Sequence, residues 1–247
     1  MGRGSSGIGA GGGAVGGNPY SDGIVTEAQQ KTLKQIAKRT ANLKNEQLRI
    51  VDENGNVVLE KRGGKNEVAL TVGESREYET GSVVIHNHPD GGTFSDADLS
   101  SFGYGARAIQ VSTPEGTYTL VNKNFNNKKR YDGWVGLRDK HREIKQPESE
   151  LDLRRQIRNQ TKNGKTQRAM DKINNTYMKI RQKSGTEAAN NYARKTKEQY
   201  DKLSAKRTKE IDMGVRKAIT QPYHEMFKRN AAQYGFKYSF VPNKSGR

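Results

Sequence analysis

One stretch of sequence decides the fold and the candidate site: Val83-Val84-Ile85-His86-Asn87-His88-Pro89, followed by Gly91-Gly92 and by Ser95-Asp96-Ala97-Asp98. The apolar run predicts a buried strand, whose period of two places His86 and His88 on one face. Pro89 ends the strand because it cannot donate to a sheet ladder, and the glycines then turn the chain. Ser95 opens a helix with Asp98 in its first turn, so we expect His86, His88 and Asp98 to converge.

Two imidazoles and one carboxylate form the ligand set of a catalytic zinc site, in which a fourth position stays open for water. A bound Zn2+ lowers the pKa of such a water from about 15.7 towards 7, so that hydroxide forms at neutral pH. The chain has no cysteine, so any metal must be held by nitrogen and oxygen ligands. These residues predict a Zn2+ cofactor held by His86, His88 and Asp98.

This pattern resembles the JAB/JAMM (MPN-type) zinc metallopeptidases, whose signature is a distant Glu, then His-x-His, then Ser-x-x-Asp. Its His-Asn-His-Pro start is most similar to the RadC-like branch and to the JAB-like domains of phage and mobile-element proteins. The loop between His88 and Ser95 is one residue shorter than is commonest in that family. The resemblance covers about residues 40–122. It implies zinc ligands at His86, His88 and Asp98, and a Ser95 hydroxyl that helps to bind the oxyanion.

The upstream glutamate of the signature corresponds best to Glu46, which stands before the first expected strand and shares a face with Leu48. The resemblance implies that it acts as general base towards the water and then as general acid towards the leaving amine. Glu60, and after it Glu67, remain alternatives for this role.

The surrounding sequence predicts an α+β unit with an N-terminal helix, for which the resemblance implies an MPN/cytidine-deaminase-like mixed sheet and a helix at the zinc loop. A capping box at Thr26 and Gln29 precedes apolar residues at helical spacing and predicts a helix over about 26–43. Asn54-Gly55 between two apolar runs predicts a hairpin. Further strands are expected near 67–71, 83–85, 108–112 and 117–122.

Charge divides the chain, because residues 1–122 hold 12 Lys+Arg against 14 Asp+Glu, whereas 123–247 hold 32 against 13. We therefore expect a flexible glycine-rich tail at 1–23, the zinc metallopeptidase-like domain at 24–122, and a basic, mostly helical region at 123–247. There we expect a polar, exposed helix over 187–212, a helix interrupted at Pro222, and either a strand or a docking segment at 234–240. A narrow apolar stripe is expected from Ile157, Met170, Ile173, Tyr177 and Ile180.

The basic region predicts contact with a polyanion through counterion release, either nucleic acid without sequence preference or an acidic protein surface such as a capsid. No run of about 18 apolar residues and no signal peptide is found, which predicts a cytoplasmic chain, or one associated with a virion, without a membrane.

The sequence leaves two functions open. One is a zinc-dependent peptidase or isopeptidase that hydrolyses an amide bond of a protein or peptide. The other is a phage or mobile-element protein, head-morphogenesis-like or toxin-like, whose JAB-like domain is a non-catalytic recognition module.

Overall fold

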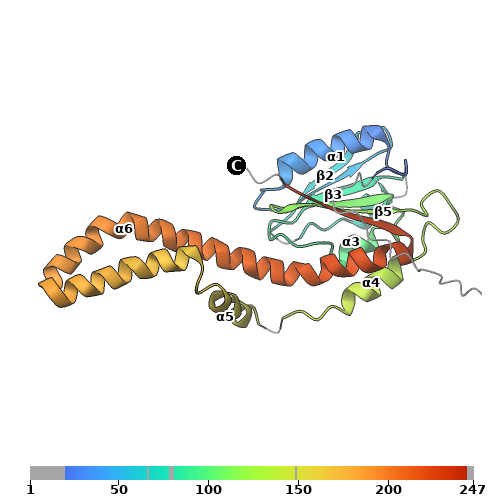
Figure 1. Cartoon of the computed structure of the whole chain (residues 1–247). Coiled ribbons are helices and arrows are strands. Elements are labelled where there is room, and N and C mark those ends of the chain that lie inside the picture. The colour runs from blue at the N-terminus through green and yellow to red at the C-terminus, as the bar shows by residue number, and fades with distance from the viewer. Residues whose placement is uncertain (1–19, 66, 78–80, 148, 244–247) are drawn as a thin grey trace, which may run out of the picture. The chain divides into compact units, whose positions relative to one another are not determined.

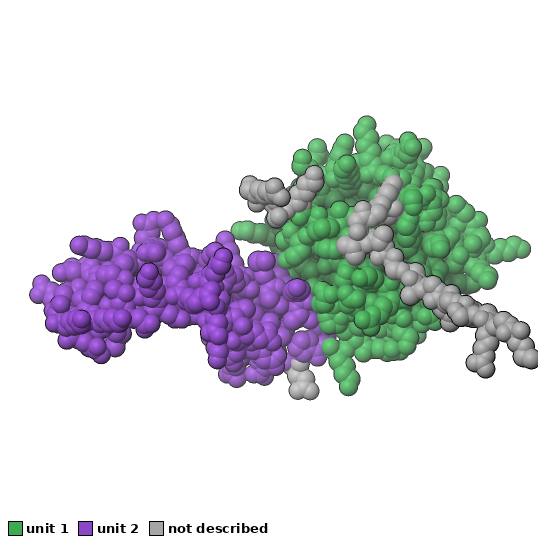
Figure 2. Space-filling view, in the orientation of Figure 1, with its two compact units in different colours: residues 1–145, 220–247 green, residues 146–219 purple. Residues whose placement is uncertain are grey.

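The computed structural model describes residues 20–65, 67–77, 81–147 and 149–243, so most of the tail expected at 1–23 lies outside the described residues. The chain forms two compact units (Figure 2), the first made of 1–145 with 220–247 and the second of 146–219. This division differs from the boundary expected at residue 122, because 123–145 and 220–243 are grouped with the sheet.

The first unit is built on a mixed sheet of six strands in the order β2-β1-β3-β4-β5-β6 (Figure 1). β3 and β4 are parallel, and every other pair of neighbours is antiparallel. The expected α+β class is therefore confirmed. The strands are β1 (Gln47–Val51), β2 (Val57–Arg62), β3 (Val83–Asn87), β4 (Ala108–Ser112), β5 (Gly116–Asn122) and β6 (Phe236–Pro242).

Helices cover both faces of this sheet. α1 (Glu27–Thr40), which starts at the expected capping box, packs Leu33 against β3 and β4 on one face. The other face carries His86 and is covered by α3 (Asp96–Ser100), α4 (Trp134–Arg142) and the last turns of α6. The core on that face includes Leu99, Leu137 and Phe227, which come from these three helices. The metal candidates thus stand at the edge of a well-packed apolar layer.

The expected strand at 67–71 does not form. Val68 and Leu70 are half-buried against the core, whereas Glu67, Ala69 and Thr71 are exposed. Every second side chain of this extended segment therefore contacts the core, although the segment does not join the sheet. β2 remains an edge strand. A short helix, α2 (Val72–Ser75), follows.

The aromatic segment near the C-terminus is a strand rather than a separate docking segment. β6 pairs with β5 from Asn122 opposite Phe236 to Gly116 opposite Pro242. Phe236 is buried, and its ring centroid lies 4.6 Å from that of Phe102. The sheet is therefore completed by residues more than 110 positions after β5 in the sequence.

The second unit is helical. It contains α5 (Glu150–Gln160) and most of α6 (Lys165–Asn230), which is followed by a 3-10 turn at Ala231–Tyr234. Helical geometry breaks at Gly185, where φ is 83° and ψ 175°, a conformation that glycine adopts without steric cost. Pro222, in contrast, lies inside α6, so the interruption expected there is wrong. No helix among the described residues has the length and apolar content needed to cross a membrane.

The break at Gly185 divides the part of α6 in the second unit into a first arm, residues 165–184, and a second arm, residues 186–219. Arg207 holds the arms together at their base, because its Nε donates to Gln167 and its Nη2 to the carbonyl of Arg158 on α5. Leu153, Ile211 and Val215 form a small core beside them. The expected apolar stripe is split, with Ile157 on α5 and its other members on the first arm.

Candidate metal centre

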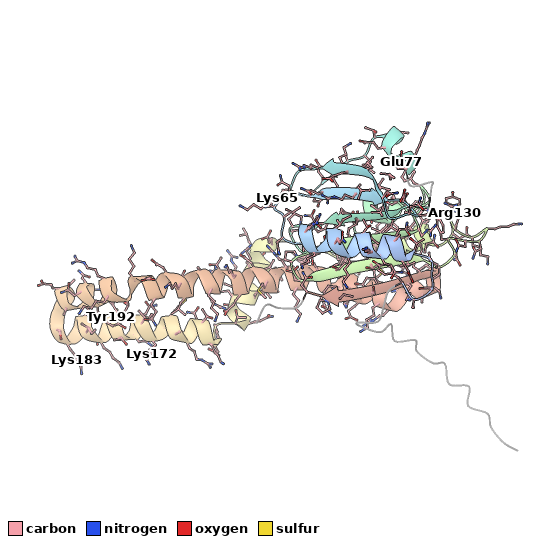
Figure 3. The ribbon with its side chains drawn as sticks, turned by 90° about the horizontal axis from the view of Figure 1, so that it is seen from above. Lys65, Glu77, Arg130, Lys172, Lys183 and Tyr192 are labelled. Atoms are coloured by element: carbon pink, nitrogen blue, oxygen red, sulfur yellow. The ribbon has the colours of Figure 1, made fainter. Side chains whose placement is uncertain are left out.

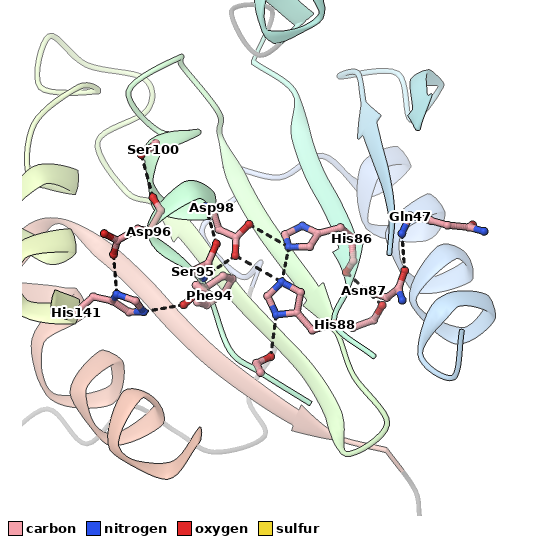
Figure 4. Close-up of polar contacts among 12 residues, drawn as sticks. Gln47, His86, Asn87, His88, Phe94, Ser95, Asp96, Asp98, Ser100 and His141 are labelled. Atoms are coloured by element: carbon pink, nitrogen blue, oxygen red, sulfur yellow. Dashed lines mark hydrogen bonds and ion pairs between the residues drawn. The ribbon is translucent and has the colours of Figure 1, made fainter. Parts of the chain in front are cut away.

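The structure brings His86, His88 and Asp98 together at the end of β3 (Figure 4). His86 Nε2 lies 2.9 Å from His88 Nε2 and 3.0 Å from Asp98 Oδ1, and His88 Nε2 lies 3.7 Å from Asp98 Oδ2. Both histidines are buried, and the side chain of Asp98 is 12% exposed. Among the residues that the structure describes, no other group of histidine and acidic side chains is arranged in this way.

A short loop carries Asp98 back to the histidines. After Pro89, Gly91 takes a φ of 86°, a left-handed turn that favours glycine. Ser95 then caps α3: the Asp98 N–H donates to Ser95 Oγ at 3.2 Å, and the Ser95 N–H donates to Asp98 Oδ2 at 2.6 Å. The capping box fixes the rotamer of Asp98, and the same carboxylate faces the histidines.

The fold sets the orientation of His88. Its Nδ1 lies 3.1 Å from the carbonyl oxygen of Gly92, and because a carbonyl can only accept, Nδ1 carries the hydrogen. In the neutral ring the lone pair is then at Nε2 and points into the cluster, as a metal ligand requires. Nδ1 of His86 is buried and has no hydrogen-bond partner among the described residues, so no such contact sets its tautomer.

The charges of the cluster act on one another. Burial alone would lower the pKa of His86, but the Asp98 carboxylate raises it above its ordinary value. Burial and the neighbouring charge of His86 lower the pKa of His88. Burial opposes ionisation of Asp98, yet the two histidines hold the pKa of its carboxyl well below the usual range. Within the cluster, the Asp98 carboxylate thus favours a proton on His86 over one on His88.

The donor set fits a zinc ion. A tetrahedral zinc with imidazole nitrogens at about 2.0–2.1 Å places neighbouring donor atoms about 3.3 Å apart. The separations here, 2.9, 3.0 and 3.7 Å, lie on both sides of that value. Shifts of a few tenths of an ångström would let all three side chains hold one ion. Binding of the ion would compete with protonation of His86, because a nitrogen that holds a metal cannot carry a proton.

Glu46 lies on the same face as the cluster. Leu48 pairs with His86 across β1 and β3, and Glu46 precedes Leu48 by two residues, so both side chains point to the His86 face. Glu46 is buried, at 7% exposed. Burial raises the pKa of its carboxyl to about 7, while His86 pulls that pKa down and Asp98 pushes it up. A carboxyl with a pKa near neutrality can both take and give a proton.

The two alternative glutamates are placed less favourably. Glu60 pairs with Arg49 at 3.0 Å, and Arg49 lies opposite Ile85 of β3, on the sheet face away from His86. Glu67 is exposed, on the segment that does not join the sheet. Of the three candidates, Glu46 is the one whose side chain is buried on the face of the metal candidates.

Ser95 is exposed beside the cluster. Its oxygen accepts the Asp98 N–H, and within the described residues its own O–H has no acceptor. The hydroxyl hydrogen is therefore free to donate to a group placed near the cluster, which suits the expected role at an oxyanion.

Asn87 lies between the two histidines, is completely buried, and is a residue for which the sequence predicted no role. Its Oδ1 accepts the Gln47 N–H at 2.9 Å, and its Nδ2 donates to the Asn45 carbonyl at 3.1 Å. These two hydrogen bonds hold the backbone on either side of Glu46 against β3, the strand that carries His86. A polar residue inside an apolar strand was the available signal.

His141, which no sequence motif marked, supports the metal loop from α4. Its Nδ1 lies 2.8 Å from Asp96 Oδ1 and its Nε2 lies 2.9 Å from the Phe94 carbonyl oxygen. Arg142 also contacts the Asp96 carboxylate. Both ring nitrogens of His141 are thus used to hold the residues on either side of Ser95. Nothing local in the sequence marks this contact, which spans more than 40 positions.

The chain was compared with models of protein families, with curated proteins and with solved structures, and none of them matches it.

Proposed function

We propose that the chain is a zinc-dependent amide hydrolase of the JAB/JAMM kind, a peptidase or isopeptidase, with an MPN-like sheet. The observation that carries the proposal is the convergence of His86, His88 and Asp98 beside a buried carboxyl with a pKa near 7. Two imidazoles and one carboxylate would hold the metal and leave a position open. When bound, zinc supplies the Lewis acidity that such hydrolysis needs.

The residues of the chain divide the remaining work. Glu46 takes the proton of the attacking water and passes it to the leaving amine, since burial raises the pKa of its carboxyl to about 7. The Ser95 hydroxyl donates to the negative charge that develops on the scissile carbonyl oxygen, while its lone pair keeps the cap of α3. His141 keeps the loop in place, and Asn87 keeps Glu46 beside the histidines.

The first test measures metal. Protein purified without chelator is expected to carry about one zinc per chain by elemental analysis, and His88→Ala is expected to lose it. If wild-type protein holds no stoichiometric metal and takes up none on titration, the proposal is wrong. Stoichiometric iron in place of zinc would move the site to a different chemistry, because two histidines and a carboxylate also hold Fe(II) in oxygenases.

The second test measures hydrolysis on general peptide and isopeptide substrates. Glu46→Gln is expected to keep the metal and lose about 10²–10⁴-fold in rate, because an amide cannot accept the proton. Glu60→Gln is the matched control, since it makes the same change on the opposite face of the sheet and is expected to keep full activity. A metal-loaded chain that cleaves neither substrate class would instead favour the recognition-module function.

A further inference from the structure

We infer that the two arms of α6 form a binding site for single-stranded nucleic acid, whose bases stack on tyrosines in a groove between the arms. This site lies within the second unit and is independent of the proposed hydrolase activity. The tyrosine groove has a volume of about 440 Å³. It is lined by Ile173, Tyr177, Tyr192, Thr196 and Tyr200, with Arg194 and Lys197 among the other residues around it.

The groove follows from helical spacing. Tyr192, Thr196 and Tyr200 are four residues apart on the second arm and share one face, and Ile173 and Tyr177 do the same on the first arm. The arms run back along each other after the break at Gly185, so the two faces meet (Figure 3). Three aromatic rings from distant positions in the sequence are thereby gathered in one place.

Packing between the two arms does not fully bury the tyrosines. Between residues 167 and 206, all of which the structure describes, Ala189 is the one buried residue. Tyr177, Tyr192 and Tyr200 are each half-buried. Two helices that bury so little against each other gain little stability from their contact, which leaves an apolar seam that a partner can cover.

Charge selects the partner. Residues 165–219 hold 15 Lys+Arg against 6 Asp+Glu. Within the described residues, Arg194 and Lys197 at the groove form no ion pair, and Lys172 and Lys183 point away from the arms into solvent (Figure 3). A second copy of the chain would bring like charges together, whereas a polyanion would be attracted and would release counterions.

Aromatic rings beside cations select single-stranded nucleic acid among polyanions. Every base offers a π-face that stacks on tyrosine, and the phosphates pair with nearby arginine and lysine without reference to sequence. A duplex hides these faces within its own stack. An acidic protein surface would use the cations but would have no need of the three rings.

The test uses the full chain and fluorescein-labelled single strands of about 20 nucleotides, followed by anisotropy from about 50 to 500 mM salt. Oligo-dT and oligo-rU are expected to bind more tightly than an abasic strand of the same length and charge, because the abasic strand lacks stacking bases. Affinity for oligo-dT should fall steeply with salt. The two labelled strands also show whether DNA or RNA is preferred.

Matched substitutions separate stacking from packing. Tyr200→Leu keeps apolar bulk but removes the ring, and it is expected to weaken oligo-dT binding about 5- to 150-fold. Tyr200→Phe keeps the ring and should bind within about twofold of wild type. Tyr131→Leu, an exposed tyrosine of the first unit, should have no effect. Circular dichroism checks that helix content is unchanged, and metal content should be the same in all variants.

Equal binding of the abasic strand and oligo-dT would overturn the inference and leave a simple polyanion surface. Equal loss in Tyr200→Leu and Tyr200→Phe would also overturn it. If Tyr200→Leu loses helix content, Tyr192→Leu with Tyr192→Phe gives the same comparison at a second ring of the groove. If neither oligo-dT nor oligo-rU binds at about 50 mM salt, the inference is wrong, and an acidic protein becomes the better partner for the basic side chains.

Discussion

The buried carboxyl of Glu46 should make the stability of the first unit depend on pH. Burial raises its pKa from an ordinary value of 4.5 to about 7. Between these values the folded chain holds a proton that the unfolded chain has released, so the unfolded state binds fewer protons and stability falls as pH rises. The contribution is full below about pH 4.5 and is lost once the pH has passed about 7.

The size of the effect follows from the shift. About 2.5 pKa units at about 1.36 kcal/mol each give roughly 3 kcal/mol. In Glu46→Gln the amide has the same shape as the carboxyl but does not titrate. The unfolding free energy of this variant should therefore not fall through the titration of residue 46 as the pH rises. Wild type should therefore lose roughly 3 kcal/mol relative to Glu46→Gln between pH 4.5 and 7.5.

Urea unfolding of metal-free protein in chelator measures this difference. Trp134 is the only tryptophan, and it lies in α4 against the core of the first unit, so its fluorescence reports unfolding of the unit that holds Glu46. Groups that do not interact with Glu46 titrate alike in both proteins and cancel, whereas His86, whose pKa the Glu46 carboxylate raises, also contributes to the difference. Parallel stability profiles for the two proteins would refute the inference that Glu46 is buried and neutral below pH 7.

Three further substitutions test the surroundings of the site. Phe236→Ala should destabilise the first unit by about 3–5 kcal/mol in the same assay, and Val241→Ala, on the exposed end of β6, by much less. Asn87→Ala leaves two backbone groups beside Glu46 without partners and should cost about 1–3 kcal/mol. His141→Ala should weaken zinc binding about tenfold or more in a competition titration with a chelating dye, and unchanged affinity would show that α4 does not support the metal loop.

Local patterns predicted much of the first unit. The helix at α1, the hairpin of β1 and β2, and strands β3, β4 and β5 follow from capping, turn and alternation signals that a few neighbouring residues carry. The segment at 67–71 shows the limit of such signals. Its alternation is real and matches its burial, but alternation does not determine whether an extended segment finds a hydrogen-bonded neighbour.

The metal candidates could be predicted because His86, His88 and Asp98 stand within one strand, one turn and one helix start. The contacts that support them come from far along the chain, such as His141 on α4. The sequence pattern already favoured Glu46 over Glu60, and the sheet register added the physical reason, because it places Glu60 on the face away from His86. The break at Gly185 rather than at Pro222 required the backbone itself, since a helix can include proline at the cost of a hydrogen bond.

The place of β6 in the sequence bears on how the protein is made. Residues 123–235 are synthesised between the last residue of β5 and the first of β6. At about 5–20 residues per second, translation of that interval takes roughly 6–23 s. During this time one edge of β5 has no partner strand, and an open strand edge of this kind can pair with other chains until β6 covers it.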